Sequence, residues 1–184
     1  MMKLTRIFLG GRFWAAGLLG MMVGLGSGCA SANGLAHQRG EPAPTTGKVL
    51  TGPELRAVAP GAILGDNFYA EVNSAWLTEW YRLFRAQLFK MGIVHWNARF
   101  DCNRFADFYS NLAQAFFSME MYHSRTPAQA LALGPFWYVR DDGKGSHAVI
   151  QALTERGRVF IDPQTGKELD LSPGERRSGY VQFF

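Results

Sequence analysis

The sequence predicts an α+β domain in which helices precede an antiparallel β-sheet. Apolar side chains recur at helical spacing through residues 74–91 and 102–123. After residue 135 the pattern changes to short β-branched and aromatic runs separated by turn residues. This order is typical of α+β domains. Hydrophobic residues make up 47% of the 184 residues, which is enough for one core and excludes a wholly disordered chain.

Residues 1–28 have the features of an export signal. Three basic residues precede an apolar run at 13–25, which is shorter than the about 20 residues of a membrane-spanning helix. The stretch 25–30 resembles a bacterial lipobox, with Gly26 where that motif prefers an aliphatic residue. The resemblance implies cleavage before Cys29, lipidation of Cys29 and a membrane anchor, at the periplasmic face of the outer membrane. An ordinary cleaved signal with a chance cysteine is the alternative.

Residues 29–61 are predicted to be a flexible tether, because Ala, Gly, Pro and Thr dominate them. A short helical turn is expected at 53–58. The folded domain is therefore expected to span 62–184.

The first half of that domain is expected to hold one strand and two helices. The strand is at 67–72, and the first helix, at 74–91, has Ser74 as its candidate cap. The second helix runs from 102 to 123 with Asp101 as its N-cap, and its broad apolar side predicts burial on much of its surface.

Strands dominate the second half. They are expected at 136–139, 147–153 and 158–161, with a hairpin turn at 154–157 between the last two. A final strand at 180–184 is expected to close the sheet.

Charge and composition exclude several function classes. The net charge of +4 includes three basic residues of the signal, so 16 basic and 15 acidic residues remain, too even a balance for a nucleic-acid or anionic-membrane binder. Four histidines and Cys102 show no metal-ligand spacing, and there is no Gly-rich phosphate loop. No metal, no cofactor and no nucleic-acid partner are expected.

Cys102 is the first candidate for chemistry. It begins a helix, whose N-terminal N–H groups stabilise a thiolate, although a nearby charged Asp101 opposes this effect. If Cys29 is lipidated, Cys102 is the only thiol of the mature chain. The alternative is a buried, inert core cysteine.

His147 and Asp162 are the second and third candidates. With a two-residue loop at 155–156, Asp162 falls opposite Val149 and on the same sheet face as His147. A three-residue loop would place the two side chains on opposite faces. The structural alternatives are a satisfied histidine and a turn-forming aspartate before proline.

Three motifs carry a resemblance to a known family. Residues 100–106, 145–148 and 161–166 resemble the Asp-Cys-Asp-x-Phe-Ala, Gly-x-His-Ala/Ser and (Glu/Asp)-Pro-Gln-Thr-Gly motifs of bacterial relatives of the C-terminal protease domain of mushroom agglutinins. The order of thiol, histidine and acid is that of papain-like and transglutaminase-like cysteine hydrolases. The resemblance spans about residues 67–166.

The resemblance implies a papain-like fold, with the nucleophile helix packed against the antiparallel sheet. It also implies Cys102 as nucleophile, His147 as base and Asp162 as the orienting acid. Asn103 stands where relatives often have Asp, which makes a calcium site doubtful. Trp96, Asn97 and Gln87 are candidate oxyanion donors, beside the backbone N–H of the cysteine.

Together these observations predict a lipid-anchored envelope cysteine hydrolase that acts on peptide or amide bonds of a peptide or protein substrate. A catalytically silent binding or scaffolding lipoprotein with the same fold is the first alternative. A structural envelope lipoprotein whose motif matches are chance is the second.

Overall fold

The computed structural model describes residues 41–184, which form a mixed α and β fold with four helices and eight strands. In chain order the elements are β1 (Thr45–Thr51), α1 (Gly52–Val58), β2 (Phe68–Val72), α2 (Ser74–Lys90), α3 (Cys102–Met121), β3 (Ala130–Leu131), β4 (Leu133–Val139), β5 (Ser146–Thr154), β6 (Gly157–Ile161), β7 (Glu168–Leu169), α4 (Pro173–Arg177) and β8 (Val181–Gln182). The strands make one sheet with the order β1-β2-β5-β4-β8; β3 joins β2, and β6 and β7 extend from β5.

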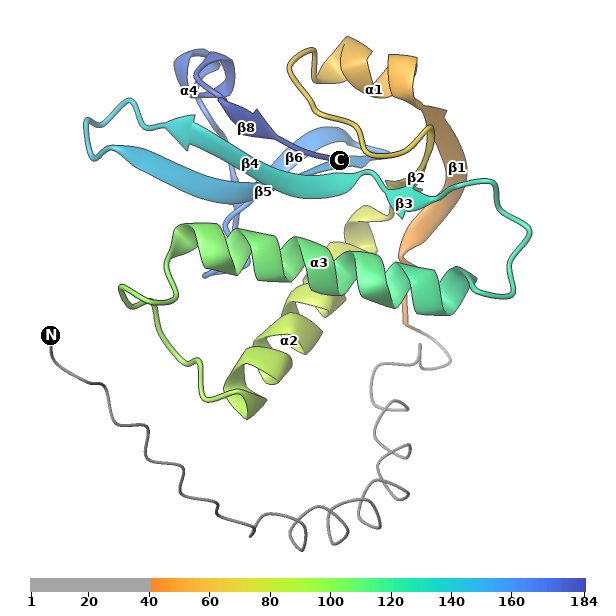
Figure 1. The fold of residues 1–184 in the computed structure, drawn as a ribbon, viewed down its shortest axis with the longest axis horizontal. Helices are drawn as coiled ribbons and strands as arrows, with labels where there is room; N and C mark the ends of the chain where they lie inside the picture. The colour runs from red at the N-terminus through yellow and green to blue at the C-terminus, as the bar shows by residue number, and fades with distance from the viewer. Residues whose placement is uncertain (1–40) are drawn as a thin grey trace, which may run out of the picture. The chain divides into compact units, whose positions relative to one another are not determined.

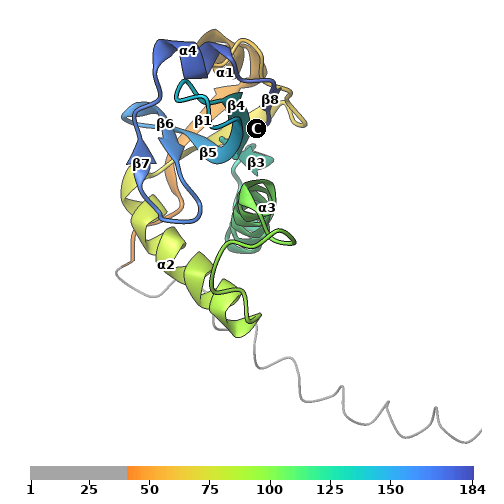
Figure 2. The same cartoon turned by 90° about the vertical axis from the view of Figure 1, so that its left-hand side faces the viewer.

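Helices cover the sheet on two sides. Figure 1 shows α2 and α3 on one side of β4 and β5, with α1 and α4 on the other, and Figure 2 agrees. On the α1 side a hydrophobic cluster joins the helix to three strands through Leu50, Leu55, Tyr69 and Leu153. Burial of this apolar surface is the main force that holds the helix against the sheet.

Aromatic side chains hold α2 and α3 together. The ring of Tyr109 on α3 lies 6.1 Å from Trp80 and 4.9 Å from Phe84, both on α2, and all three residues are fully buried. The edge-to-face arrangement is one that aromatic pairs prefer. Gln114 then fixes α3 to the sheet, because its amide donates to the carbonyls of Leu131 and Leu133 and accepts from the Leu131 N–H.

The β5–β6 hairpin has the register that the two-residue loop predicts. Thr154 pairs with Gly157, and Ile150 pairs with Ile161. Gly157 has a φ of +96°, a conformation that favours glycine at this turn. Continuing the same register by one residue places Asp162 beside Val149.

The second helix begins and ends close to its predicted limits, and Asp101 caps it by accepting a hydrogen bond from the Arg104 N–H. The cap of α2 differs from the expectation. Asn73 accepts from the Ala75 N–H, whereas Ser74 is already inside the helix and bonds to Glu155.

The predicted tether at 29–61 is wrong over its second half. Residues 45–51 form β1, which pairs antiparallel with β2, and the helical turn expected at 53–58 is α1. Leu50 is 3% exposed and Leu55 is fully buried, so this segment belongs to the core. Strands therefore precede the helices as well as follow them.

The predicted export signal, the lipidation site Cys29 and the start of the tether lie outside the described residues. Over residues 41–184, no helix combines the length and apolar character needed to cross a membrane.

Candidate functional site

Cys102 is the first residue of α3 and is partly exposed, which argues against the alternative of a fully buried core cysteine. Its Sγ donates a weak hydrogen bond to Asn103 Oδ1 at 3.6 Å. The capping residue Asp101 also lies 3.9 Å from the guanidinium of Arg104, which offsets part of its negative charge. The thiol thus sits where helix N–H groups favour an anion.

His147 lies near the start of β5 and is paired with Tyr138 of β4. The two rings are edge to face, with centroids 6.0 Å apart. Burial lowers the pKa of His147, and the cation of Arg140 lowers it further, whereas the negative charge of Asp162 raises it. The imidazole therefore favours its neutral form, which is the form a general base requires.

Asp162 follows β6 directly and shares a sheet face with His147. Its carboxylate is held by its own turn: Oδ1 accepts from the Gln164 N–H at 2.8 Å, and Oδ2 accepts from the Thr165 hydroxyl at 3.0 Å. The negative charge of this carboxylate raises the pKa of His147.

Two of the three predicted site residues stand at the start of their elements, Cys102 on α3 and His147 near the start of β5. Figure 1 shows α3 and β5 both beginning at the end of the molecule where the loop after β4 leads into β5. The β5–β6 register puts His147 and Asp162 on one sheet face, but the hydrogen bonds of the Asp162 carboxylate go to Gln164 and Thr165 and not to His147. The structure does not join Cys102 to His147 by a hydrogen bond, since the hydrogen bond of Cys102 Sγ goes to Asn103.

The three oxyanion candidates differ in their surroundings. Trp96 is 57% exposed in the loop before α3. The amide oxygen of Asn97 closes a turn by accepting from the N–H groups of Arg99 and Phe100. Gln87 lies on α2, three residues before the last residue of that helix.

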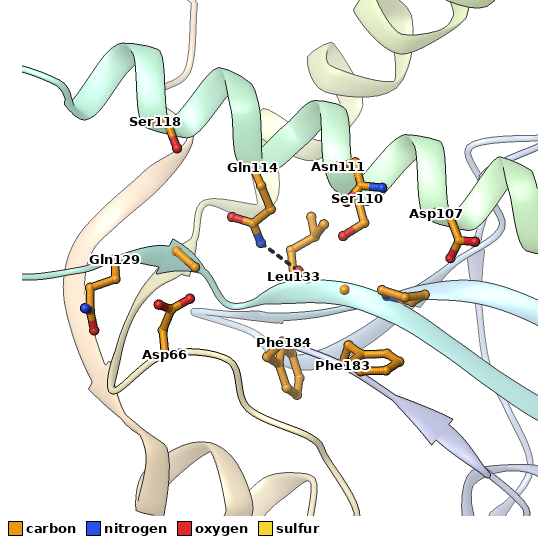
Figure 3. Close-up of a pocket in the computed structure, with 13 residues that line it drawn as sticks. Asp66, Asp107, Ser110, Asn111, Gln114, Ser118, Gln129, Leu133, Phe183 and Phe184 are labelled. Atoms are coloured by element: carbon orange, nitrogen blue, oxygen red, sulfur yellow. Dashed lines mark hydrogen bonds between the residues drawn. The ribbon is translucent and has the colours of Figure 1, made fainter.

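A separate cavity of about 440 Å³ runs along another face of α3. Figure 3 shows its polar wall from α3, including Asp107, Asn111 and Ser118, opposite the chain end with Phe183 and Phe184. Burial raises the pKa of Asp107 there. None of the predicted catalytic residues lines this cavity.

Within the described range, no group of three or more His, Cys, Asp or Glu side chains is arranged to hold a metal ion.

Three neighbours of the site were not foreseen. Tyr138 packs on the His147 ring, Arg140 acts on its charge, and Asn103 accepts from the thiol. Strand pairing was the available signal for Tyr138, because a β4–β5 hairpin brings it opposite the histidine. Asn103 was noticed only as a departure from a motif.

Comparison with known proteins gives a likeness in fold. Neither the family profiles nor the curated proteins that were compared match the chain. Among solved structures, the PSL1a–E64 complex matches with a TM-score of 0.54 and 19% identity, over 74% of this chain and 51% of that one. The lectin of Polyporus squamosus bound to a human-type influenza-binding epitope, Neu5Acα2-6Galβ1-4GlcNAc, matches with a TM-score of 0.52 and 20% identity, over 74% and 49%.

The chain thus spans about half the length of each of these neighbours. Identities of 19–20% support a shared fold and nothing finer. The likeness to a mushroom lectin that the sequence predicts is supported at the level of the fold. A papain-like peptidase and a lipoprotein stay predictions.

Proposed function

We propose that this domain is a cysteine hydrolase of the papain-like class, in which Cys102, His147 and Asp162 form the catalytic triad. The observation that supports it most is the β5–β6 register, which, continued by one residue, puts Asp162 on the same sheet face as His147, while α3 begins with a partly exposed cysteine. Three sequence motifs in matching order support the same residues.

In the proposed reaction His147 takes the thiol proton, and the thiolate attacks the carbonyl carbon of a peptide or amide bond. The imidazolium then donates its proton to the leaving amine, and water hydrolyses the thioester. Asp162 orients the imidazole and stabilises its cation. Because the thiol bonds to Asn103 in this structure, it has to leave that partner for His147 before the first step.

Alkylation of the native full-length chain tests this proposal. E64, an epoxide that alkylates activated thiols, and iodoacetamide are each applied near pH 7, and peptide mass mapping separates Cys102 from Cys29. We expect His147→Ala to slow iodoacetamide labelling of Cys102 by about tenfold, because the variant lacks the base that takes the thiol proton and so holds less of the reactive thiolate.

His95→Ala is the control, since it removes another histidine, one that is exposed to solvent in the loop before α3. Thermal melts confirm that each variant is folded. A Cys102 that resists both reagents until the chain unfolds contradicts the hydrolase proposal.

A catalytically silent binding domain with the same fold is the second candidate. The name of one neighbour, a lectin bound to a sialylated epitope, favours it over hydrolysis. Because this chain covers only half of each neighbour, a glycan site is a proposal for this chain too. Glycan-array binding by the Cys102→Ala variant, with no turnover by the unmodified chain, would support the silent domain.

We further propose that the chain is exported and anchored through a lipid on Cys29, at the periplasmic face of the outer membrane. The lipobox-like stretch 25–30 supports this. Cys29→Ser is expected to abolish lipid labelling and to release the protein from membranes; unchanged membrane retention and gel mobility would contradict it.

A further inference from the structure

The turn that carries Asp162 is closed by its own backbone. The N–H of Asp162 donates to the Lys167 carbonyl at 2.9 Å, and its carbonyl accepts from the Gly166 N–H at 2.8 Å. Together with the bonds of the carboxylate to Gln164 and Thr165, these make residues 162–167 one compact unit. The direction of the carboxylate therefore depends on how this unit is held against the rest of the fold.

Tyr81 of α2 holds that unit at two points. Its hydroxyl donates to the Gln164 carbonyl at 2.9 Å. Its ring lies against Gly166 so closely that a Cβ there would be 2.4 Å from the ring carbon Cδ1. Gly166 has a φ of +72°, so both its conformation and this contact favour glycine.

Tyr81 also lies near the acid that it supports. Burial raises the pKa of Tyr81, and the charge of Asp162 raises it further. The neighbouring positions on α2 are anchored by the buried rings of Trp80 and Phe84, both of which contact Tyr109 of α3. The helix α2, which supports the turn that carries Asp162, therefore also packs against α3, the helix that begins with Cys102.

We propose that Tyr81 is a positioning residue, which acts through the 162–167 turn to hold the Asp162 carboxylate toward His147. This inference rests on the proposed function for its catalytic meaning. The effect of Tyr81 on the His147–Asp162 pair can be measured without any enzymatic turnover.

The test is an NMR titration of His147 in the full-length chain. Three charged or aromatic groups act on this imidazole: Asp162, Arg140 and the ring of Tyr138. Asp162→Asn gives the reference shift, because removal of the negative charge lowers the pKa of His147. Tyr81→Phe removes only the hydroxyl and is expected to lower that pKa in the same direction, by roughly half as much, since the carboxylate then faces the imidazole for less of the time.

Tyr122→Phe is the matched control, because Tyr122 is 81% exposed beyond the end of α3 and is expected to leave the titration unchanged. Gly166→Ala is an independent second variant, which displaces the ring of Tyr81 and is expected to lower the pKa of His147 as well. If Asp162→Asn shifts the titration while Tyr81→Phe and Gly166→Ala do not, the positioning role is overturned.

A different result would overturn the proposed function instead. If His147 responds to Tyr81→Phe as expected but Cys102 of the unmodified chain resists alkylation, the positioning role stands and the hydrolase does not. If Asp162→Asn leaves the titration unchanged, the pair on which both proposals depend does not exist.

Discussion

Leu55 gives the most direct measurement of where the folded domain begins. It lies on α1 inside the segment that the sequence suggests is a tether, yet its side chain is fully buried. Its cluster includes Leu50 from β1, Tyr69 from β2 and Leu153 from β5. These neighbours come from three different strands, so they are poorly able to collapse into the space that a truncated side chain would leave.

Leu55→Ala is therefore expected to lower the free energy of unfolding by about 3 kcal/mol, within the roughly 2–5 kcal/mol typical of buried leucines. For a domain of this size, each kcal/mol corresponds to about 2–4 °C, so the melting temperature should fall by about 6–12 °C. Val58→Ala on the same helix is the control. Val58 is 43% exposed, and its truncation should change stability by no more than about 0.5 kcal/mol.

Urea and thermal unfolding of the two variants, followed by circular dichroism, provide the measurement. If the Leu55→Ala and Val58→Ala variants have the same melting temperature, α1 is not part of the cooperative core. The tether would then extend through α1, and the placement of β1 beside β2 would lose its energetic basis.

Three further outcomes follow from the contacts. Asp101→Ala removes the N-cap of α3 and should cost about 0.5–2 kcal/mol in urea unfolding; no loss would mean that the cap bond is dispensable. Arg158→Met leaves the amide oxygens of Gln151 and Gln182 without their guanidinium donor and should cost about 1–3 kcal/mol, measured likewise. Because burial lowers the pKa of folded His147 below its ordinary value of 6.5, the unfolded chain binds more protons between the two values, and stability falls as pH drops through that window. His147→Gln should therefore flatten the stability profile between about pH 7 and 5, and an unchanged slope would contradict the cause given.

The sequence predicts those features that depend on neighbouring residues. A two-residue turn fixes the β5–β6 register, so the common face of His147 and Asp162 follows from local spacing. The capping of α3 by Asp101 is likewise a local signal.

Features that depend on distant partners are harder to predict. β1 follows a stretch rich in Pro, Ala and Thr and contains Gly47, which hides its strand character, and its place in the sheet comes from pairing with β2, for example Thr51 with Phe68. β3, β7 and β8 contain two residues each, too few for any periodicity. The position of Cys102 relative to His147 depends on how α3 packs across the sheet, which no local pattern determines.

The charges around Cys102 connect the two candidate functions. The positive end of the α3 dipole favours an anion at this position. Asp101 weakens that effect, but it also caps the helix and lies near Arg104, while the next residue, Asn103, is a neutral amide rather than a second carboxylate. An aspartate at 103 would add a negative charge within contact distance of the sulfur and oppose any anion there. A neutral side chain at 103 therefore opposes an anion less than a carboxylate would, whether that anion is a thiolate in a hydrolase or a ligand group in a silent binding domain, so reactivity of the thiol is the property that separates the two.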